Sequence, residues 1–237
     1  DLHGLLHSFP TRRSSDLIGG YLAAEPAHRP DAPPPPPPGD DFPVIRSMVQ
    51  PGARILDLGC GNGDLLAALT AGTNAPGLGL DLDFQAVLEA IRRGVPVLMR
   101  DMDEGLDSIP DQTFDFAILS RTLQVVRKPA DVLREMMRVA RRAIVTMPNV
   151  ANWKHRLRLG LEGRMPKSAA LPFNWYDTPN IHLATLADFL DLCRTARIRV
   201  TRLHCVAEDP VSRALLGLGC RNLGADAIVA LLERDDA

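Results

Sequence analysis

Residues 55–64 read Ile55-Leu56-Asp57-Leu58-Gly59-Cys60-Gly61-Asn62-Gly63-Asp64. An apolar run ends in a carboxylate and is followed by three glycines at alternate positions. Glycines at a strand end let the backbone turn sharply and leave out the Cβ atoms that would block a ligand. A helix that begins directly after such a turn points its free N–H groups into it. The pattern predicts a strand, a turn and a helix that together bind a small-molecule cofactor.

The charges around the glycines narrow the choice of cofactor. A dinucleotide-binding turn has the spacing G-x-G-x-x-G and holds a pyrophosphate on the helix N-terminus. Here the spacing is one residue tighter, and Asp57 and Asp64 flank the turn. Carboxylates repel a pyrophosphate but suit a ligand that carries an ammonium and a sulfonium group. We therefore expect S-adenosylmethionine (SAM). A glycine turn that serves as a tight connection and binds nothing is the alternative.

Two further carboxylates follow apolar runs. Asp81 ends the next run, about 20 residues past the glycine turn, where an acidic residue holds a ribose diol by two hydrogen bonds. Asp83 is its competitor for that role. Asp101 follows the third run, where it could accept a hydrogen bond from an adenine amino group while Met102 packs on the ring. For Asp101, the alternative is a loop carboxylate that caps the next turn.

In order and spacing, the glycine turn with Asp81 and Asp101 resembles the class I SAM-dependent methyltransferases. The resemblance implies an α/β, Rossmann-like fold with a seven-stranded, mostly parallel sheet and helices on both faces. It implies SAM or S-adenosylhomocysteine as the ligand. The implied cofactor residues are Asp57, Gly59, Gly61, Gly63, Asp81, Asp101, Met102 and Ser120.

A narrower resemblance covers the chain from about Asp40 to its end. The stretches Arg92-Arg93-Gly94-Val95, Leu119-Ser120-Arg121-Thr122-Leu123-Gln124, Arg164-Met165-Pro166 and Trp175-Tyr176-Asp177-Thr178-Pro179-Asn180-Ile181-His182 are similar to the MetW family of methionine-biosynthesis proteins. The last stretch is the most specific, because general methyltransferase chemistry does not require it. The resemblance implies a partner that supports homoserine O-acyltransferase (MetX), with the nucleotide site sensing SAM.

Composition excludes several classes of function. The 237 residues, 46% of them hydrophobic, suffice for one α/β domain with a tail. A net charge of −2 gives no global basis for nucleic-acid binding. No apolar run approaches the roughly 18 residues needed to span a bilayer. The four cysteines contain no C-x-x-C pair, so we expect reduced thiols, no metal site and a cytoplasmic protein.

The N-terminal residues require separate treatment. Residues 1–17 end in Phe9-Pro10-Thr11-Arg12-Arg13-Ser14-Ser15-Asp16-Leu17, which resembles a translated sequencing adapter, so we expect a non-native peptide. Residues 18–40 contain six consecutive prolines at 33–38 and are expected to form a disordered leader. A docking motif for a proline-reading domain is the alternative. The expected SAM-binding, methyltransferase-like domain covers 41–237.

Alternating apolar runs and helical stretches predict parallel βαβ units from residue 41 onward. The expected strands are 54–58, 76–81, 95–99, 114–119, 142–147, 198–206 and 225–232. The expected helices are 43–49, 64–71, 84–93, 130–140 and 186–196. Because ligands bind at the carboxyl ends of such strands, we expect Ser120, Arg121, Gln124 and Asn149 at the substrate edge.

Residues 148–184 are longer than a simple connection requires, so we expect an insert. It contains both tryptophans, Tyr176 and His182. It is interpreted as a lid or a partner-docking surface; a satellite core is the alternative. Its early part is basic, with Lys154, His155, Arg156, Arg158, Arg164 and Lys167 interleaved with Leu157, Leu159 and Leu161.

Whether the chain catalyses a reaction stays open at this point. Methyl transfer from a sulfonium depends chiefly on positioning, and a general base is optional. The candidate bases are His182 and Tyr176. The leading hypothesis is a MetW-like SAM-binding protein that supports or regulates MetX. An active methyltransferase on a small-molecule acceptor is the second hypothesis, and an NAD-dependent enzyme is the third.

Overall fold

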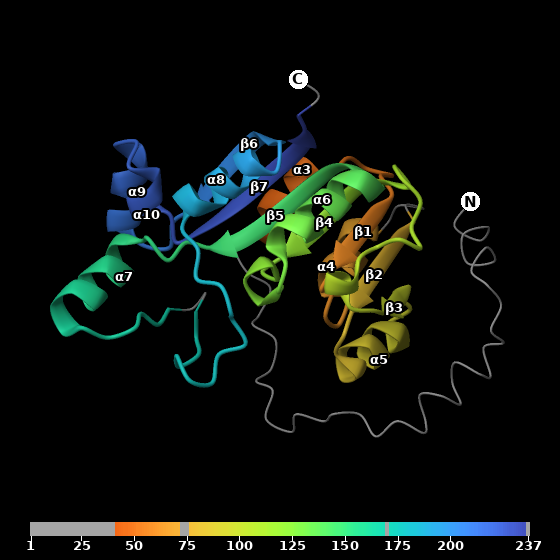
Figure 1. Cartoon of the computed structure of the whole chain (residues 1–237), viewed down its shortest axis with the longest axis horizontal. Helices are drawn as coiled ribbons and strands as arrows, with labels where there is room; N and C mark the ends of the chain where they lie inside the picture. The colour runs from red at the N-terminus through yellow and green to blue at the C-terminus, as the bar shows by residue number, and fades with distance from the viewer. Residues whose placement is uncertain (1–40, 72–75, 169–170, 236–237) are drawn as a thin grey trace. The chain divides into compact units, whose positions relative to one another are not determined.

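The computed structural model describes residues 41–71, 76–168 and 171–235. The expected adapter-like peptide at 1–17 and the proline-rich leader at 18–40 lie outside the described residues. Within the described ranges, a seven-stranded sheet carries helices on both faces (Figure 1). None of the helices in these ranges is long and apolar enough to cross a membrane.

The sheet has the strand order β3-β2-β1-β4-β5-β7-β6. The strands β1 to β5 run parallel to one another, whereas β7 lies antiparallel between β5 and β6. The predicted fold class is therefore confirmed. The strands are β1 Ile55–Leu58, β2 Gly77–Asp81, β3 Val97–Met99, β4 Phe114–Ser120, β5 Ala140–Pro148, β6 Ile198–Val206 and β7 Ala227–Arg234.

Five of the described helices cover the two faces of the sheet. One hydrophobic core lies under α3, α4 and α5 and the other under α6 and α8. Side chains alternate between these cores along a strand, so Ile55 belongs to the first while Leu56 and Leu58 belong to the second. These helices are α3 Phe42–Met48, α4 Asp64–Thr70, α5 Phe84–Arg92, α6 Pro129–Val139 and α8 Leu186–Thr195.

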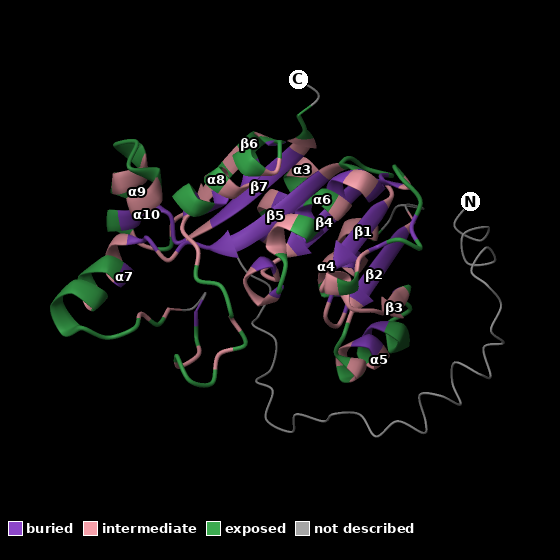
Figure 2. Ribbon diagram, in the orientation of Figure 1, coloured by how far each residue is buried: buried purple, intermediate pink, exposed green. Residues whose placement is uncertain are grey.

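The central strands are apolar because both of their faces are covered. All four residues of β1 are buried, and so are the last six of β5 (Figure 2). Parallel strands in α/β proteins read as continuous hydrophobic runs for this reason. Asp57 breaks the run in β1, so a carboxylate stands in an otherwise apolar layer.

Several predicted strand boundaries are wrong by two residues, namely the starts of β3, β5 and β7 and the end of β7. β3 begins at Val97, because the N–H of Val95 donates to the carbonyl of Ala90 and completes the end of α5 around Gly94 (φ +76°). β7 begins at Ala227, because the N–H of Ala225 donates to the carbonyl of Arg221 and closes a preceding helix.

That helix is one of several elements that the sequence reading did not anticipate. Between β6 and β7 lie α9 Pro210–Gly217 and α10 Arg221–Gly224. After β5, α7 Trp153–Leu157 continues into a π-helical turn, η3 Arg158–Glu162. Short 3-10 turns follow β3 (η1, Met102–Glu104) and β4 (η2, Leu123–Val125).

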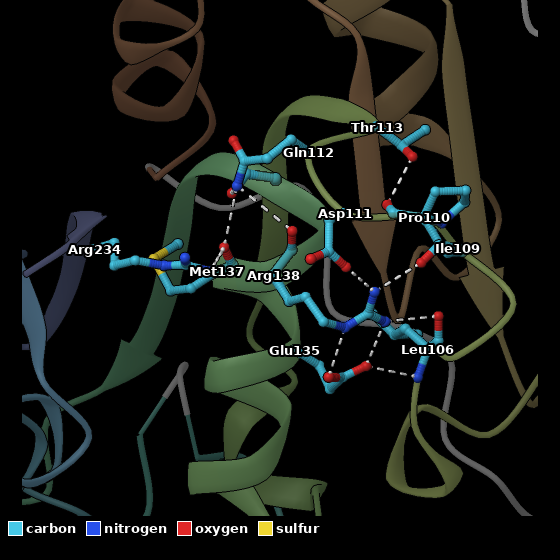
Figure 3. Close-up of polar contacts among 11 residues, drawn as sticks. Leu106, Ile109, Pro110, Asp111, Gln112, Thr113, Glu135, Met137, Arg138 and Arg234 are labelled. Carbon is cyan, nitrogen blue, oxygen red and sulfur yellow. Dashed lines mark hydrogen bonds and ion pairs between the residues drawn. The ribbon is translucent and has the colours of Figure 1, made fainter. Parts of the chain in front are cut away.

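The end of α6 is fixed by one arginine (Figure 3). Arg138 pairs with Glu135 one turn earlier and with Asp111. Its remaining N–H groups donate to the carbonyls of Leu106 and Ile109 at 2.9 and 2.8 Å. A guanidinium can make these contacts together because it carries five N–H donors. The loop before β4 is thereby attached to α6.

Candidate functional site

The glycine turn joins β1 to α4. Gly59, Gly61 and Gly63 have φ values of +71°, +54° and +80°, a conformation that residues with a Cβ rarely adopt. A Cβ on Gly59 would lie 2.6 Å from the Thr122 hydroxyl, and one on Gly63 would lie 3.0 Å from Val95. A Cβ on Gly61 would meet nothing within 4 Å. Gly61 therefore borders open space in which a ligand could lie.

Asp81 stands beside this turn at the end of β2. Its Oδ2 accepts a hydrogen bond from the N–H of Gly61 at 2.7 Å, and its Oδ1 accepts from the N–H of Asp83 at 2.8 Å. Asp83 itself caps α5, accepting from the N–H groups of Gln85 and Ala86. Of the two sequence candidates for a ribose contact, Asp81 is therefore the one at the turn.

Asp57 is the unusual residue of the site. It is 1% exposed, and neither carboxylate oxygen has a hydrogen-bond partner among the described residues. Burial raises its pKa to about 7, and the nearby Asp81 carboxylate adds to the effect. A buried ionised group without a partner is costly, so this position favours a cation close by.

Asp101 follows β3 and caps η1, where its Oδ1 accepts from the N–H of Asp103 at 2.8 Å. Its Oδ2 accepts from Nη2 of Arg127 at 2.7 Å. Arg127 also pairs with Asp103 at 3.3 Å, a contact that sequence reasoning missed. The cap proposed as the alternative for Asp101 is present, and the neighbouring Met102 packs against the core.

The end of β4 is hydrogen-bonded to Asp41, the residue that precedes α3. Ser120 Oγ lies 3.3 Å from the Thr146 hydroxyl, which donates to the buried Asp41 at 3.2 Å. Arg121 donates to both oxygens of Asp41 at 3.1 Å. Arg121 has φ +52°, which is strained for a non-glycine residue. Its side chain is thus engaged in an internal pair.

A pocket of about 310 Å³ lies where β4 and β5 end. Its lining includes the polar side chains of Gln124 and His182, and Pro148 at the end of β5. The apolar lining residues include Leu123, Met147, Leu171, Phe189 and Leu192. The backbone N–H groups of Ile181 and His182 both donate to the carbonyl of Gln124 and hold the insert against η2. His182 lines this pocket; Tyr176 does not.

The expectation that Asn149 faces a ligand is wrong. Its side chain is fully buried and donates to the carbonyls of Asn222 and Ala225. Its Oδ1 accepts from the N–H groups of Ala151 and Leu186. Asn149 therefore fixes the start of the insert and of α8.

Across the described ranges, no group of three or more acidic, histidine or cysteine side chains is arranged to hold a metal ion.

Much of the insert is exposed (Figure 2), and several of its exposed residues are large and apolar. Trp175 and Tyr176 are 74% and 71% exposed and stack edge to face with ring centroids 5.7 Å apart. The other exposed large apolar residues of the insert are Leu157, Leu159, Leu161, Met165, Ile181 and Leu183. Exposed apolar groups gathered on one segment are typical of interaction sites.

The basic residues of the insert are less available than the sequence suggests. Lys154 pairs with Asp209 at 3.0 Å and with Asp226 at 2.7 Å. His155 is buried, and burial lowers its pKa. Arg158 pairs with Glu162. Part of the positive charge of the basic face is therefore neutralised by internal ion pairs.

Comparisons with known proteins agree with this geometry. A family model described as "Methionine biosynthesis protein MetW" matches residues 39–227. The "Bifunctional methionine biosynthesis protein MetXA/MetW" of Rhodopirellula baltica is 37% identical over 172 residues, which cover 69% of this chain and 28% of that protein. The "2-phytyl-1,4-naphtoquinone methyltransferase" of Synechococcus elongatus is 39% identical over 114 residues, 43% of this chain and 48% of that protein. The chain thus spans less than half the length of these curated relatives.

Among solved structures, a SAM-dependent methyltransferase from Mesorhizobium loti has a TM-score of 0.61 at 18% identity, covering 82% of this chain and 97% of that one. This likeness establishes the fold. The family match covers most of the chain, including the glycine turn and the insert. The chain therefore belongs to the MetW family of methionine-biosynthesis proteins and has the fold of the class I SAM-dependent methyltransferases.

Proposed function

We propose that this chain is a SAM-binding protein that associates with homoserine O-acyltransferase (MetX) in the cytoplasm and supports its activity. The observation that carries the proposal is the bifunctional MetXA/MetW relative, in which the two names belong to one polypeptide. Two activities joined in one chain are held at a high effective concentration. A binding surface between separate chains would provide a similar proximity.

The residues at the glycine turn fit SAM as the ligand. Gly61 leaves room for it, and the orphaned oxygens of Asp57 would accept its ammonium group directly or through water. Asp81 would hold the ribose hydroxyls, and Asp101 with Met102 would contact the adenine. Gly59, Gly63 and Ser120 would shape the turn and the adjoining strand end. S-adenosylhomocysteine shares these groups, apart from the sulfonium.

The insert is the candidate docking surface for the acyltransferase. Its exposed apolar side chains would lose contact with water on association, which is the main favourable term in most protein interfaces. Trp175 and Tyr176 are the residue types that most often dominate such interfaces. The proposal assigns these side chains to the partner and leaves the glycine turn for SAM.

Co-elution of the two purified proteins in size-exclusion chromatography tests the association. Two leucines form a matched pair, because Leu161 in the insert and Leu218 after α9 are both 78% exposed. We expect Leu161→Ala to weaken the complex and Leu218→Ala to leave it unchanged. Separate elution at saturating concentrations would overturn the proposed association, and equal effects of the two variants would move the interface elsewhere.

A second candidate function is methyl transfer to a small apolar acceptor. The pocket at the ends of β4 and β5 favours it, because this is the sheet edge where ligands of α/β folds bind. His182 would be the base, and Tyr176, which lies outside the pocket lining, is the weaker candidate. Incubation with methyl-labelled SAM and a metabolite extract tests this function. A protein that binds SAM and transfers no label would count against it.

The third hypothesis, NAD binding, is tested by comparing the thermal shifts that NAD and SAM produce. The acidic residues flanking the turn disfavour a pyrophosphate. We expect SAM to raise the melting temperature of the chain and NAD to have no effect at the same concentration. Tighter binding of NAD than of SAM would remove both of the functions above.

A further inference from the structure

The sheet edge opposite the glycine turn carries a second concave surface. β4, β5 and β6 begin at this edge and the antiparallel β7 ends there, so their terminal residues meet. They border an open cleft of about 500 Å³. Its lining includes four arginines, namely Arg141, Arg142, Arg199 and Arg234.

Two carboxylates also line the cleft, and both are already paired. Glu233 is shared by Arg142 at 2.9 Å and Arg199 at 3.7 Å. Asp115 accepts from the Arg54 guanidinium, which lies outside the cleft lining, at 3.1 and 3.2 Å. It also accepts from the Arg54 backbone N–H at 2.9 Å. The four arginines of the cleft therefore share one carboxylate, Glu233, because Asp115 is already paired with Arg54.

Two of the arginines keep unused charge. Among the described residues, neither Arg141 nor Arg234 has a carboxylate within ion-pair distance. Arg141 lies near enough to Asp115 to help lower the pKa of that carboxyl, after the larger effect of the Arg54 hydrogen bond. Both side chains are exposed. The cleft therefore has an excess of positive charge.

Arg234 is held in place by the end of α6. Its Nη2 donates to the carbonyl of Met137 at 3.2 Å, and Gln112 lies beside the same helix end (Figure 3). Capping of the last turn of α6 is enough to explain this one hydrogen bond between Arg234 and Met137. A guanidinium has five N–H donors, so four remain on a side chain that one hydrogen bond already orients. An anion bound there would require less ordering of the side chain.

We propose that this cleft binds a small ligand that carries a di- or triphosphate group. Arginine forks match phosphate oxygens in geometry and charge. The cleft volume lies within the roughly 300–1,000 Å³ range of small-molecule sites, which favours a compact ligand over an extended surface. The proposal is independent of the SAM site, because the two lie at opposite edges of the sheet.

Calorimetric titration of the full chain with inorganic triphosphate at low ionic strength tests the proposal. We expect saturable binding with one site per chain. Arg141→Ala and Arg234→Ala should each weaken it by about tenfold or more, since hydrogen bonds to charged groups are the strong ones. Arg213→Ala is the matched control. Arg213 is an exposed arginine of α9, which lies between the end of β6 and the start of β7, away from the cleft. Its affinity for triphosphate should equal that of the wild type.

The melting temperatures of the three variants establish that each is folded. SAM affinity should be the same in all of them, which separates this site from the proposed cofactor site. Absence of saturable triphosphate binding at millimolar concentration would overturn the proposal. Equal weakening by Arg213→Ala would also overturn it, because it would indicate a general charge effect. Equally tight binding of citrate would contradict the assignment to phosphate.

Discussion

The backbone N–H of Gly61 donates to the Oδ2 of Asp81 at 2.7 Å, so the glycine turn after β1 is joined to the end of β2. Asp81, the residue proposed to hold the ribose of SAM, thereby also positions the turn. The same carboxylate is close enough to Asp57 to raise its pKa, after the larger effect of burial. Asp81 therefore affects both the position of the turn and the pKa of Asp57.

The first prediction contrasts two glycines of the turn. Gly59→Ala places a methyl group 2.6 Å from Thr122 Oγ1, whereas Gly61→Ala meets nothing within 4 Å. Both variants carry the cost of a positive φ, about 1–2 kcal/mol. Gly59→Ala should lose about 1–3 kcal/mol more, because overpacking is added. Urea denaturation monitored by circular dichroism measures the difference; equal losses would contradict the geometry of the turn.

The same pair should separate stability from ligand binding. A methyl group on Gly61 fills the open space that the proposed site assigns to SAM. We expect Gly61→Ala to remain folded and to lose SAM affinity by about tenfold or more, since the ligand cannot approach the backbone. Calorimetric titration measures this. An unchanged affinity in a folded Gly61→Ala protein would place SAM elsewhere.

Asp57 gives a prediction about stability and pH. Its pKa of about 7 in the folded protein lies above its ordinary 3.8, so the protonated carboxyl favours the folded state. Stability should therefore fall as pH rises from about 4 to about 7, by at most about 4 kcal/mol. Asp57→Asn has no such titration, so the variant should be more stable than the wild type at about pH 8 and nearly equal to it at about pH 4.

Melting temperatures across this range compare the two proteins directly. The Asp188→Asn variant is a useful reference, because Asp188 has its pKa lowered by hydrogen bonds from Thr185. A carboxylate of that kind stabilises the fold above its unfolded pKa, so its removal should have the opposite sign at neutral pH. Parallel pH profiles for the wild type and Asp57→Asn would show that Asp57 does not titrate as described.

The affinity for SAM should depend on the ionisation of the same carboxyl group, Asp57. An ionised Asp57 attracts the ammonium of SAM, and a protonated one does not. We expect SAM affinity to increase as pH rises through about 7 in the wild type, where Asp57 loses its proton. The dependence should be absent in Asp57→Asn. A wild-type affinity that is flat over this range would separate Asp57 from the ligand.

A fourth prediction concerns the pair between Asp41 and Arg121. Asp41 is 5% exposed and accepts two hydrogen bonds from the Arg121 side chain and one from Thr146. Asp41→Asn should lower the free energy of unfolding by about 1–3 kcal/mol, because hydrogen bonds to a charged group are lost in a protected place. Urea denaturation measures the change.

Asp191→Asn is the control for Asp41→Asn. Asp191 also pairs with an arginine, Arg194, but both side chains are more than 60% exposed. Exposed pairs contribute about 0–1 kcal/mol, so this variant should be close to the wild type. Similar losses in the two variants would mean that burial of Asp41 has no energetic consequence.

The fold could be predicted because its strands are short apolar runs between glycines, prolines and acidic residues. Residues 198–206 form a strand with the predicted bounds. The C-terminal helices were missed because α9 has eight residues and α10 has four, too few for a helical period to show. At Val95, the apolar run in the sequence begins before the strand does, because a turn hydrogen bond to Ala90 determines where β3 can start.

The candidate site was predictable where the backbone itself specifies the residue. Glycines at alternate positions have few explanations besides positive φ and close approach, and the turn has both. Asn149 shows the limit. A polar residue after a strand looks like a ligand contact, but its partners are carbonyls of Asn222 and Ala225, more than 70 positions away in the chain. Arg127 was missed for the same reason, since its acidic partners precede it by 24 and 26 positions.

The proposed support of homoserine O-acyltransferase by this chain can be measured through the rate of homoserine acylation. The acyltransferase from the same source is assayed at fixed concentration while the purified chain is added. We expect a rate that rises and saturates with added wild-type chain, with a weaker response to Leu161→Ala than to Leu218→Ala. A rate that stays constant when the chain is in large excess would contradict the claim.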